Sequence, residues 1–377
     1  MSGSAEPAPR GNLRRVAGPG SGPNGAPRAI ALSPILSARY RARDLERIQA
    51  AAPSARVVNL SVEGLADGPL DDVEVLLRGW LSSDAFDRLL VRAPGLSWVH
   101  SATTGVERAL TPAARERGIV ITNARGVFSR PIAEYVLMMI LAVSRRLPQL
   151  LELQRERTWQ PLEGQELRDV TVGIVGLGSI GRAVGSLASA FGCRVIATRR
   201  RHELGAGGSG DGDDVPVQAW GDPGDDQELV GMTVGRGPER VVGPDALNEL
   251  LAESDFVVLA APLTPETDGM IDGPALAAMK PGAWLINVAR GGLVDERALL
   301  RALREGPIGG AILDTFREEP LGGSSPFYDL PNVILTPHTS WSSGRVLDRS
   351  VDLFCENLRR FAEGEPLVNV VDPNAGY

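Results

Sequence analysis

Cysteine, histidine and basic charge are all scarce in this chain of 377 residues. Its two cysteines, Cys193 and Cys355, cannot build a disulfide framework or a metal-ligand cluster, so no metal is expected. The formal net charge of −8 argues against nucleic acid, because binding a phosphate backbone needs a concentrated basic face. The longest apolar run, residues 135–143, is too short to span a bilayer, so no membrane partner is expected either.

The N-terminus lacks the apolar core that a secretory signal needs. Residues 1–27 are instead rich in Gly, Pro, Ser and Ala, and we expect them to form a disordered segment. Without a signal or a membrane segment, the expected location is the cytoplasm.

The rest of the chain has the composition of a globular protein, with 43% hydrophobic and 23% charged residues. Its length predicts two domains. Short β-rich runs alternate with helical segments after Arg28, and a second, more regular series begins at Leu167, which indicates two α/β domains with doubly wound parallel sheets. A long apolar helix, opening at Pro131 and ending at Arg145 and Arg146, is expected to bridge them.

One stretch interrupts the second series. Residues 203–239 contain clusters of glycine and aspartate and few large apolar side chains. A structureless stretch of this length is unusual within a compact domain, so we expect a mobile surface insertion.

A glycine-rich turn follows the first strand of the second series. Gly176, Gly178 and Gly181 have the G-x-G-x-x-G spacing, and the turn opens an amphipathic helix that leads to another strand. Gly176 would permit the tight turn, Gly178 the approach of a pyrophosphate, and Gly181 the close packing of helix on strand. The motif in this context predicts a nicotinamide dinucleotide.

The end of the next strand bears on the choice of dinucleotide. An Asp or Glu there would bind the ribose hydroxyls of NAD, but the sequence reads Thr198-Arg199-Arg200. A guanidinium holds a 2′-phosphate, so NADP is preferred and NAD remains possible. The alternative is that these arginines form a solvated edge.

Hydride transfer to a carbonyl needs a proton donor, and the chain has three histidines. His202 starts the low-complexity stretch, and His100 ends an apolar run and could point either way. His338 follows the strand 333–335, where a loop would face the crevice of an α/β domain, and it is the strongest candidate.

Two groups of suitable chemistry follow neighbouring strands. Arg290 comes after the strand 284–288 and could clamp a carboxylate in bidentate fashion. Glu319 lies in the loop after the strand 311–313 and could orient the ring of His338.

Five motifs occur in the order typical of one family: VGLGSIG at 175–181, APLTPET at 261–267, NVARGGLVD at 287–295, DTFREEP at 314–320 and TPH at 336–338. From Arg28 to its end the chain resembles the D-isomer-specific 2-hydroxyacid dehydrogenases, including glyoxylate/hydroxypyruvate reductases. The resemblance implies an oxidoreductase that interconverts a 2-oxo acid and the D-2-hydroxy acid. It also implies that Arg290 holds the carboxylate and carbonyl, that His338 is the acid/base and that Glu319 bonds the imidazole.

Further site residues follow from the same resemblance. The backbone of Thr104, Gly105 and Val106 would grip the substrate carboxylate. The cofactor would be bound at Gly176, Gly178, Ser179, Ile180, Gly181, Arg199, Arg200, Ala261, Pro262, Thr267, Val288, Ala289 and Asp314, with Asp314 near the nicotinamide carboxamide.

The resemblance also implies an architecture. A dinucleotide-binding Rossmann domain at 131–336 would be inserted into a discontinuous, flavodoxin-like substrate domain at 28–130 and 337–377. The family is usually dimeric through its dinucleotide domain, so a homodimer is expected. Two departures are Arg199, where the family often carries Asp, and the length of the 203–239 stretch.

Other members of the same fold remain as alternatives. A formate dehydrogenase would lack the acid partner that Glu319 provides, and a phosphoglycerate dehydrogenase with a regulatory domain is not expected because the sequence ends soon after the substrate domain. A non-enzymatic, dinucleotide-sensing corepressor is the remaining alternative. The substrate stays open: Trp341, Trp98 and His100 could line a pocket or pack in a core, and glyoxylate and hydroxypyruvate are reasonable candidates.

Overall fold

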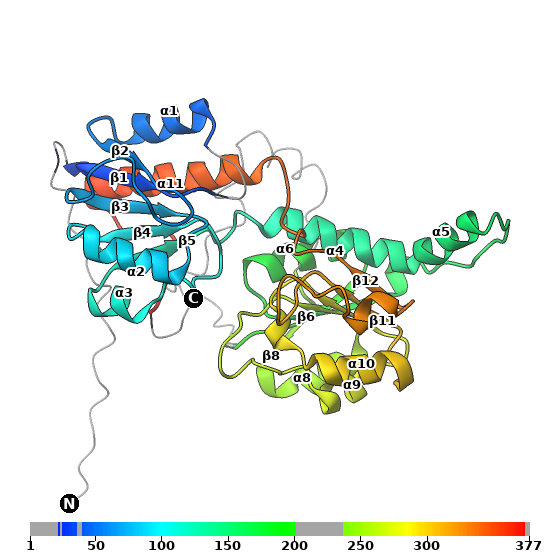
Figure 1. The fold of residues 1–377 in the computed structure, drawn as a ribbon. Coiled ribbons are helices and arrows are strands. Elements are labelled where there is room, and N and C mark those ends of the chain that lie inside the picture. Colours follow the sequence, from blue (N-terminus) through cyan, green and yellow to red (C-terminus); the bar gives the residue numbers. More distant parts are fainter. Residues whose placement is uncertain (1–21, 23–24, 36–39, 201–236, 374–377) are drawn as a thin grey trace, which may run out of the picture. The chain divides into compact units, whose positions relative to one another are not determined.

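The computed structural model describes residues 22, 25–35, 40–200 and 237–373. The chain divides into two compact units, one of Met1–Ala124 with Ser350–Tyr377 (unit 1) and one of Arg125–Arg349 (unit 2). Most of the expected N-terminal segment and residues 203–236 of the expected insertion lie outside the described residues. Figure 1 labels the elements of both units, which are taken in turn.

The sheet of unit 1 has five parallel strands in the order β2-β1-β3-β4-β5. This is the flavodoxin-like order, and it confirms the predicted doubly wound sheet. The strands are β1 (Ala29–Leu32), β2 (Arg56–Asn59), β3 (Val73–Arg78), β4 (Trp98–Ser101) and β5 (Val120–Asn123). Strands β1, β3 and β4 are buried at every residue, as is typical of a parallel sheet that is covered on both faces.

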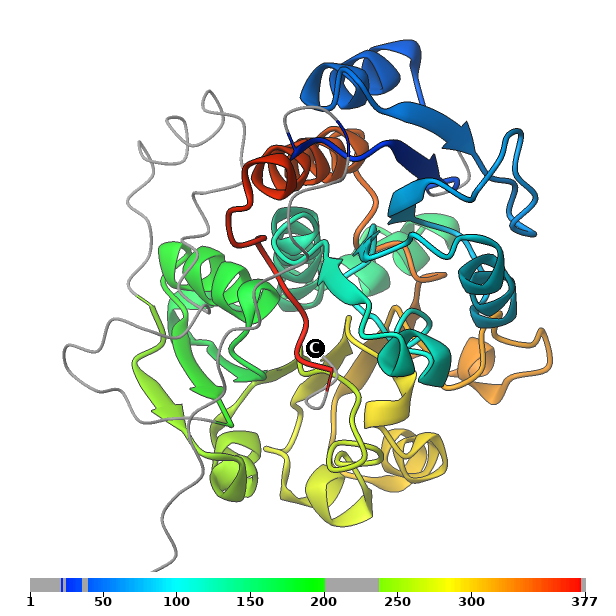
Figure 2. The same cartoon turned by 90° about the vertical axis from the view of Figure 1, so that its left-hand side faces the viewer.

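Helices cover both faces of this sheet, as Figures 1 and 2 show. They are α1 (Ala42–Ala51), α2 (Ser83–Arg92), α3 (Pro112–Glu116) and α11 (Val346–Glu363). Phe86 and Leu89 of α2 join Val99 of β4 in one core cluster. On the opposite face the ring of Trp98 stacks on Phe361 of α11, so alternate residues of β4 serve two different cores.

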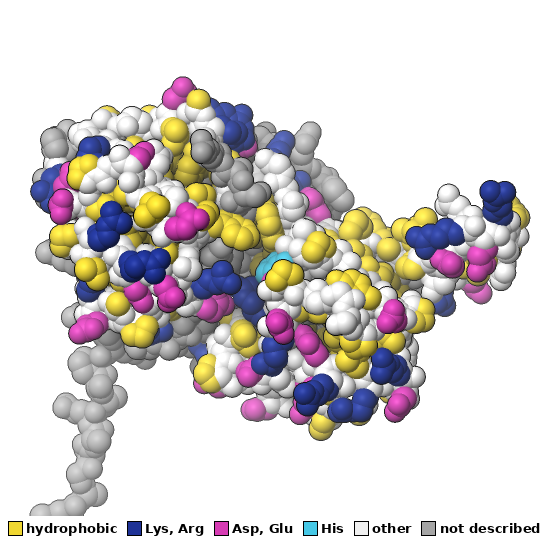
Figure 3. All heavy atoms as spheres, in the orientation of Figure 1, with side chains coloured by type: hydrophobic (Ala, Val, Ile, Leu, Met, Phe, Trp, Pro, Cys, Tyr) yellow, Lys and Arg dark blue, Asp and Glu magenta, His cyan; other side chains and the backbone are white. Residues whose placement is uncertain are grey.

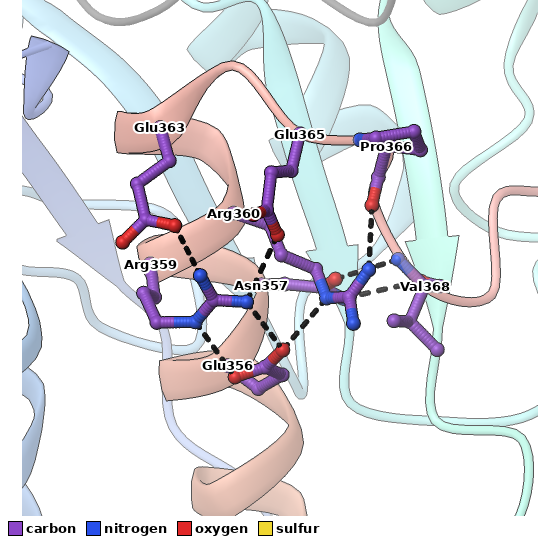
Figure 4. Close-up of polar contacts among 8 residues, drawn as sticks. All are labelled: Glu356, Asn357, Arg359, Arg360, Glu363, Glu365, Pro366 and Val368. Carbon is purple, nitrogen blue, oxygen red and sulfur yellow. Dashed lines mark hydrogen bonds and ion pairs between the residues drawn. The ribbon is translucent and has the colours of Figure 1, made fainter.

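The C-terminal end of α11 is fixed by a network of polar contacts, shown in Figure 4. Arg359 bonds Glu356 at 3.0 Å and Glu365 at 2.9 Å, and Arg360 bonds Glu356 at 2.7 Å. Buried Asn357 bonds both backbone groups of Val368, at 2.7 and 3.1 Å. The following residues then pair with the edge strand, where the amide of Val371 donates to the carbonyl of Ile121. The network therefore lets the tail cover an otherwise open edge of the sheet.

The sheet of unit 2 has seven parallel strands in the order β12-β11-β10-β9-β6-β7-β8. The chain enters at β6, continues outward through β7 and β8, and then crosses to β9 and on to β12. This is the Rossmann order with one added strand. The strands are β6 (Thr171–Val175), β7 (Arg194–Thr198), β8 (Arg240–Val242), β9 (Phe256–Leu259), β10 (Trp284–Asn287), β11 (Gly310–Leu313) and β12 (Val333–Leu335).

Two layers of helices enclose this sheet (Figures 1 and 2). Helix α4 (Ser129–Ser144) packs against α6 (Ser179–Ala190) on one face. On the other face α8 (Leu247–Glu253), α9 (Gly273–Ala278) and α10 (Glu296–Glu305) join a core cluster with the strands. The remaining elements are helix α5 (Leu147–Arg155) and the 3-10 turns η2 (Leu167–Asp169), η4 (Pro244–Ala246), η5 (Gly291–Leu293) and η6 (Pro326–Asp329).

The compact units differ in their bounds from the predicted domains. Unit 2 takes in residues 125–130 and 337–349, which the sequence assigned to the substrate domain. The amides of Thr339 and Ser340 bond the carboxylate of Asp314, and Arg349 bonds the carbonyl of Val127 at 3.0 Å. These bonds hold both added segments within unit 2.

The surface is of mixed charge. On the face shown in Figure 3, basic and acidic side chains are interspersed on both units. None of the helices in the described part of the chain has the length and apolar character needed to cross a lipid bilayer.

Candidate active site

The candidate residues of unit 2 converge because its strands are parallel. The loops that carry Gly176, Arg290, Glu319 and His338 follow β6, β10, β11 and β12, so they emerge along one edge of the sheet. The direction of strand addition reverses between β6 and β9, and ligands of open α/β sheets bind at such a switch point.

The glycine turn lies at this switch point. Gly176 has φ of 101°, and a Cβ there would lie 2.6 Å from the backbone nitrogen of Ala261, so both conformation and space demand glycine. A Cβ on Gly181 would lie 2.2 Å from the carbonyl oxygen of Gly176 and 3.0 Å from the side chain of Ile174 in β6, so the helix packs closely on the strand, as predicted. Around Gly178 there is open space, and α6 begins at the next residue, Ser179. The first amides of α6 and the space at Gly178 fit a pyrophosphate.

The end of β7 presents positive charge near the APLTPET loop. Arg199 is half-buried, and its amide bonds the carbonyl of Val242, whereas Arg200 is exposed. A hydrogen bond from Thr264 and, to a smaller extent, the charge of Arg200 hold the pKa of Glu266 below its usual range. Glu266 was not among the predicted site residues, although it belongs to the APLTPET motif.

The APLTPET loop is organised by its own hydroxyls. Thr267 Oγ1 donates to the carbonyl of Pro262 at 2.7 Å and accepts from the amide of Thr264 at 2.8 Å. Ala261 packs on the backbone of Gly176, so the loop lies beside the glycine turn. Val288 and Ala289 are buried after β10, which is the neighbour of β9, the strand before the APLTPET loop.

His338 is paired with Glu319. Its Nδ1 lies 2.8 Å from Glu319 Oε2, and the other carboxylate oxygen accepts the amide of Phe316 at 3.0 Å. Both side chains are more than a third exposed. Because a carboxylate only accepts, Nδ1 carries a proton here, and Nε2 is the ring nitrogen left for exchange with a substrate. The predicted pair is confirmed as a contact.

Arg290 follows β10 in a loop that touches the Glu319 loop. A Cβ on Gly291 would lie 1.9 Å from the carbonyl carbon of Phe316, so the two backbones are in direct contact there. The half-buried side chain of Arg290 bonds the carbonyl of Ala289 at 2.9 Å, and Asn287 bonds the carbonyl of Arg290 at 3.0 Å. Asn287 therefore fixes the backbone of Arg290, and the guanidinium folds back onto the carbonyl of the preceding residue, in the loop beside the one that carries Glu319.

Asp314 is fully buried at the end of β11, and the turn carrying His338 wraps around it. Its carboxylate accepts the hydroxyl of Thr336 at 2.5 Å and the amides of Thr339 at 2.8 Å and Ser340 at 3.0 Å. Its carbonyl accepts the amide of His338 at 2.9 Å. Asp314 thus shapes the turn; its expected place near the nicotinamide stays a prediction. Thr336, which bonds Asp314 in this turn, was not among the predicted site residues.

The expected carboxylate loop belongs to unit 1, where it follows β4. Asn123 bonds the carbonyl of Thr104 at 2.9 Å, and Thr103 bonds the carbonyl of Gly105 at 2.7 Å, while Val106 is buried in the core. These bonds occupy two carbonyls of the loop and fix its backbone.

The aromatic candidates separate clearly. Trp98 and His100 are fully buried in unit 1, with Phe354 of α11 at 5.6 Å from both rings. They are core residues, which decides between the alternatives that the sequence left open. Trp341 is half-buried and packs edge-on against Phe128 in unit 2.

Comparison with known proteins indicates the family of the chain. The model described as D-isomer specific 2-hydroxyacid dehydrogenase, NAD binding domain, matches residues 137–208 and 233–340. A solved structure, an NADPH-dependent glyoxylate/hydroxypyruvate reductase from Sinorhizobium meliloti in complex with NADP and sulfate, has a TM-score of 0.72 and 27% identity, and the match covers 93% of this chain and 99% of that one.

Two curated relatives differ in the share of their own length that the match covers. A D-3-phosphoglycerate dehydrogenase of Mycobacterium tuberculosis is 34% identical over 310 residues, which are 80% of this chain and 51% of the relative. The chain thus spans about half the length of such relatives. A glyoxylate reductase of Korarchaeum cryptofilum is 33% identical over 330 residues, covering 85% of this chain and 87% of the relative. The chain belongs to the D-isomer specific 2-hydroxyacid dehydrogenase family.

Proposed function

We propose that this protein is an NAD(P)-dependent oxidoreductase that interconverts a 2-oxo acid and the D-2-hydroxy acid. The observation that carries the proposal is the bond of 2.8 Å between His338 Nδ1 and Glu319, in loops at the carboxyl edge of a Rossmann sheet. A carboxylate that orients an imidazole is the arrangement of a general acid/base. Glu319 also disfavours the formate dehydrogenase alternative.

When bound, a reduced nicotinamide would supply the hydride that the C2 carbonyl of the 2-oxo acid needs in the reductive direction. Arg290 binds the substrate carboxylate and polarises the carbonyl oxygen. His338 gives its Nε2 proton to that oxygen, which becomes the hydroxyl, while Glu319 keeps the ring oriented through Nδ1. The amides of Thr104–Val106 in unit 1 also hold the carboxylate, and oxidation reverses these steps.

The preferred cofactor is NADP, with NAD as a weaker substitute. The support is the pair Arg199 and Arg200 at the end of β7, where a carboxylate would repel a 2′-phosphate. Both guanidinium groups are proposed to bind the 2′-phosphate. The contacts at Ser179, Ile180, Ala261, Pro262, Thr267, Val288, Ala289 and Asp314 are proposed with it.

Small 2-oxo acids such as glyoxylate and hydroxypyruvate are the proposed substrates. The test is a panel of glyoxylate, hydroxypyruvate, its phosphorylated form and an apolar 2-oxo acid, each assayed with NADPH and NADH. We expect turnover of a small 2-oxo acid, faster with NADPH, and a product of the D configuration. No turnover with any pair would overturn the proposal in favour of a dinucleotide-sensing protein, and equal or faster rates with NADH would overturn the cofactor preference.

A homodimer formed through unit 2 is part of the proposal. None of the residues of α5 is buried, and it projects from the rest of unit 2 in Figure 1. Leu147, Leu150 and Leu151 on it are largely exposed, and Trp159 beyond it is fully exposed. Apolar surface of this kind marks a protein interface. Light scattering of the purified chain tests the dimer; a monomer at micromolar concentration would contradict it. The cytoplasmic location remains a prediction.

A further inference from the structure

A hydroxyl on helix α4 is connected to the turn that carries His338. Tyr135 lies on α4, and its Oη is 2.7 Å from Thr336 Oγ1. Thr336 Oγ1 is in turn 2.5 Å from Asp314 Oδ1. The two residues that begin and end this connection are far apart in sequence, so no motif contains them.

The direction of these bonds is fixed by what each group can donate. The carboxylate of Asp314 can only accept, so the hydroxyl of Thr336 donates its single hydrogen to Asp314. The hydroxyl of Tyr135 must then donate to Thr336 Oγ1. Burial and, to a smaller extent, the charge of Asp314 raise the pKa of Tyr135 to about 12, so its proton is present at any working pH. The result is a one-way chain from tyrosine to threonine to aspartate, in which each bond strengthens the next.

The turn at the end of this chain holds its histidine in an unfavourable backbone conformation. His338 has φ of 52°, in the left-handed region that residues other than glycine rarely adopt. Such a conformation persists only where the surroundings enforce it. Here the bonds from Thr336, Thr339 and Ser340 to Asp314 provide that enforcement.

We propose that Tyr135 is a positioning residue for His338: its hydroxyl fixes Thr336, and through it Asp314 and the turn that presents the imidazole. Its catalytic part rests on the proposed role of His338 as the acid/base. Helix α4 begins at Ser129, shortly after the chain enters unit 2 at Arg125. Through these hydrogen bonds, helix α4 therefore helps to hold the proposed acid/base in place.

The first test does not depend on activity. In Tyr135→Phe, amide hydrogen exchange of Thr339 and Ser340, followed by NMR, should accelerate several-fold at unchanged exchange in the core strands. The matched control is Tyr40→Phe, which removes a tyrosine hydroxyl bonded at 2.8 Å to the carbonyl of Ser33 in unit 1. Unchanged exchange of the two amides in Tyr135→Phe would overturn the chain of hydroxyls, whatever the protein catalyses.

The second test concerns catalysis. With a 2-oxo acid that the wild-type protein reduces, Tyr135→Phe should lower kcat by about 3- to 10-fold, the usual worth of one neutral hydrogen bond, with little change in KM. The solvent deuterium isotope effect on kcat should rise, because proton transfer from a misplaced imidazole becomes slower. Tyr40→Phe should change neither quantity.

A double-mutant cycle then tests whether the effect of Tyr135→Phe on kcat is transmitted through Thr336. Thr336→Val breaks the chain in its middle, and Thr336→Ser keeps the hydroxyl. Tyr135→Phe should cost nothing further in the Thr336→Val background and should retain its effect in Thr336→Ser. Equal losses in both backgrounds, or a loss confined to KM, would overturn the positioning role. Absence of turnover in the wild-type protein would overturn the proposed function while leaving the exchange result intact.

Discussion

Two of the histidines occupy opposite surroundings, one in each unit. His100 is fully buried in β4 among aromatic rings, and burial lowers its pKa to about 3. His338 is partly exposed in a loop after β12 and is bonded to Glu319. Burial keeps the imidazole of His100 neutral, whereas the imidazole of His338 is partly exposed and paired with a carboxylate. The same side chain is thus a core residue in unit 1 and the proposed acid/base in unit 2, because its partners differ.

The position along the strand explains this difference. Both histidines come at the carboxyl end of an apolar run, which is why the sequence left His100 open. In unit 2, Thr336 and Pro337 end the run before His338, so the histidine falls in the loop. In unit 1 the strand continues to Ser101, so His100 remains in the sheet opposite Thr122. The residues between strand and histidine decide its role.

The largest effect that separates the two sites is expected in turnover. Replacing His338 by Gln should lower kcat by a factor on the order of 10² to 10⁴, the usual worth of a positioned acid. Gln keeps a donor for Glu319, so the loop is disturbed little. His100→Leu, the paired variant, should leave kcat close to wild type. Steady-state kinetics decides, and near-wild-type kcat in His338→Gln would remove the acid/base assignment.

The fold could be predicted from the sequence because buried parallel strands leave a strong pattern. The strands expected at 284–288 and 311–313 are found, and each differs by one residue from the bounds of β10 and β11. What was missed lacks such a pattern: α5 buries none of its residues, and β8 is three half-buried residues beside the undescribed stretch. An element that buries few residues in its own unit has no periodic pattern of apolar residues by which the sequence could reveal it.

The candidate site was likewise predictable only in part. His338, Glu319 and Arg290 were singled out because each lies in a family motif that follows a predicted strand. Tyr135 and Thr336 were not singled out, because their contact joins residues separated by 201 positions. The turn around Asp314 was likewise invisible, since it depends on backbone amides that any residue could supply. Sequence reveals candidate reacting groups more readily than the groups that hold them.

A smaller effect is expected at the partner of His338. Glu319→Gln should lower kcat/KM by about 10- to 100-fold, because a hydrogen bond to a charged group is worth more than a neutral one. Its neighbour Glu318 is exposed in the same loop, so Glu318→Gln is the matched control. Equal kinetics of the two variants would mean that the carboxylate of Glu319 has no special place beside the ring.

The smallest effect concerns the stability of unit 1 in acid, and it tests the other half of the comparison. Trp98 Nε1 donates to Thr122 Oγ1 at 2.9 Å, and that hydroxyl lies 2.8 Å from His100 Nδ1. The direction of the second bond depends on the tautomer of His100, and its Nε2 has no hydrogen-bond partner among the residues that the structure describes. A second proton would place a charge in a fully buried site and give Nε2 a hydrogen with no such partner.

Stability should therefore depend on pH with a definite sign. The pKa of His100 is about 3 when folded and 6.5 for the ordinary group, so the unfolded chain takes up the proton first. The contribution of neutral His100 is complete above pH 6.5 and is lost progressively as the pH falls toward 3. At pH 5 the loss amounts to about 2 kcal/mol of unfolding free energy. Urea unfolding at pH 7 and pH 5 measures it, and His100→Leu should lose that much less on acidification than the wild-type protein. Identical losses in the two proteins would show that His100 is already charged in the fold, and the contrast between the two histidines would then have to rest on Glu319 alone.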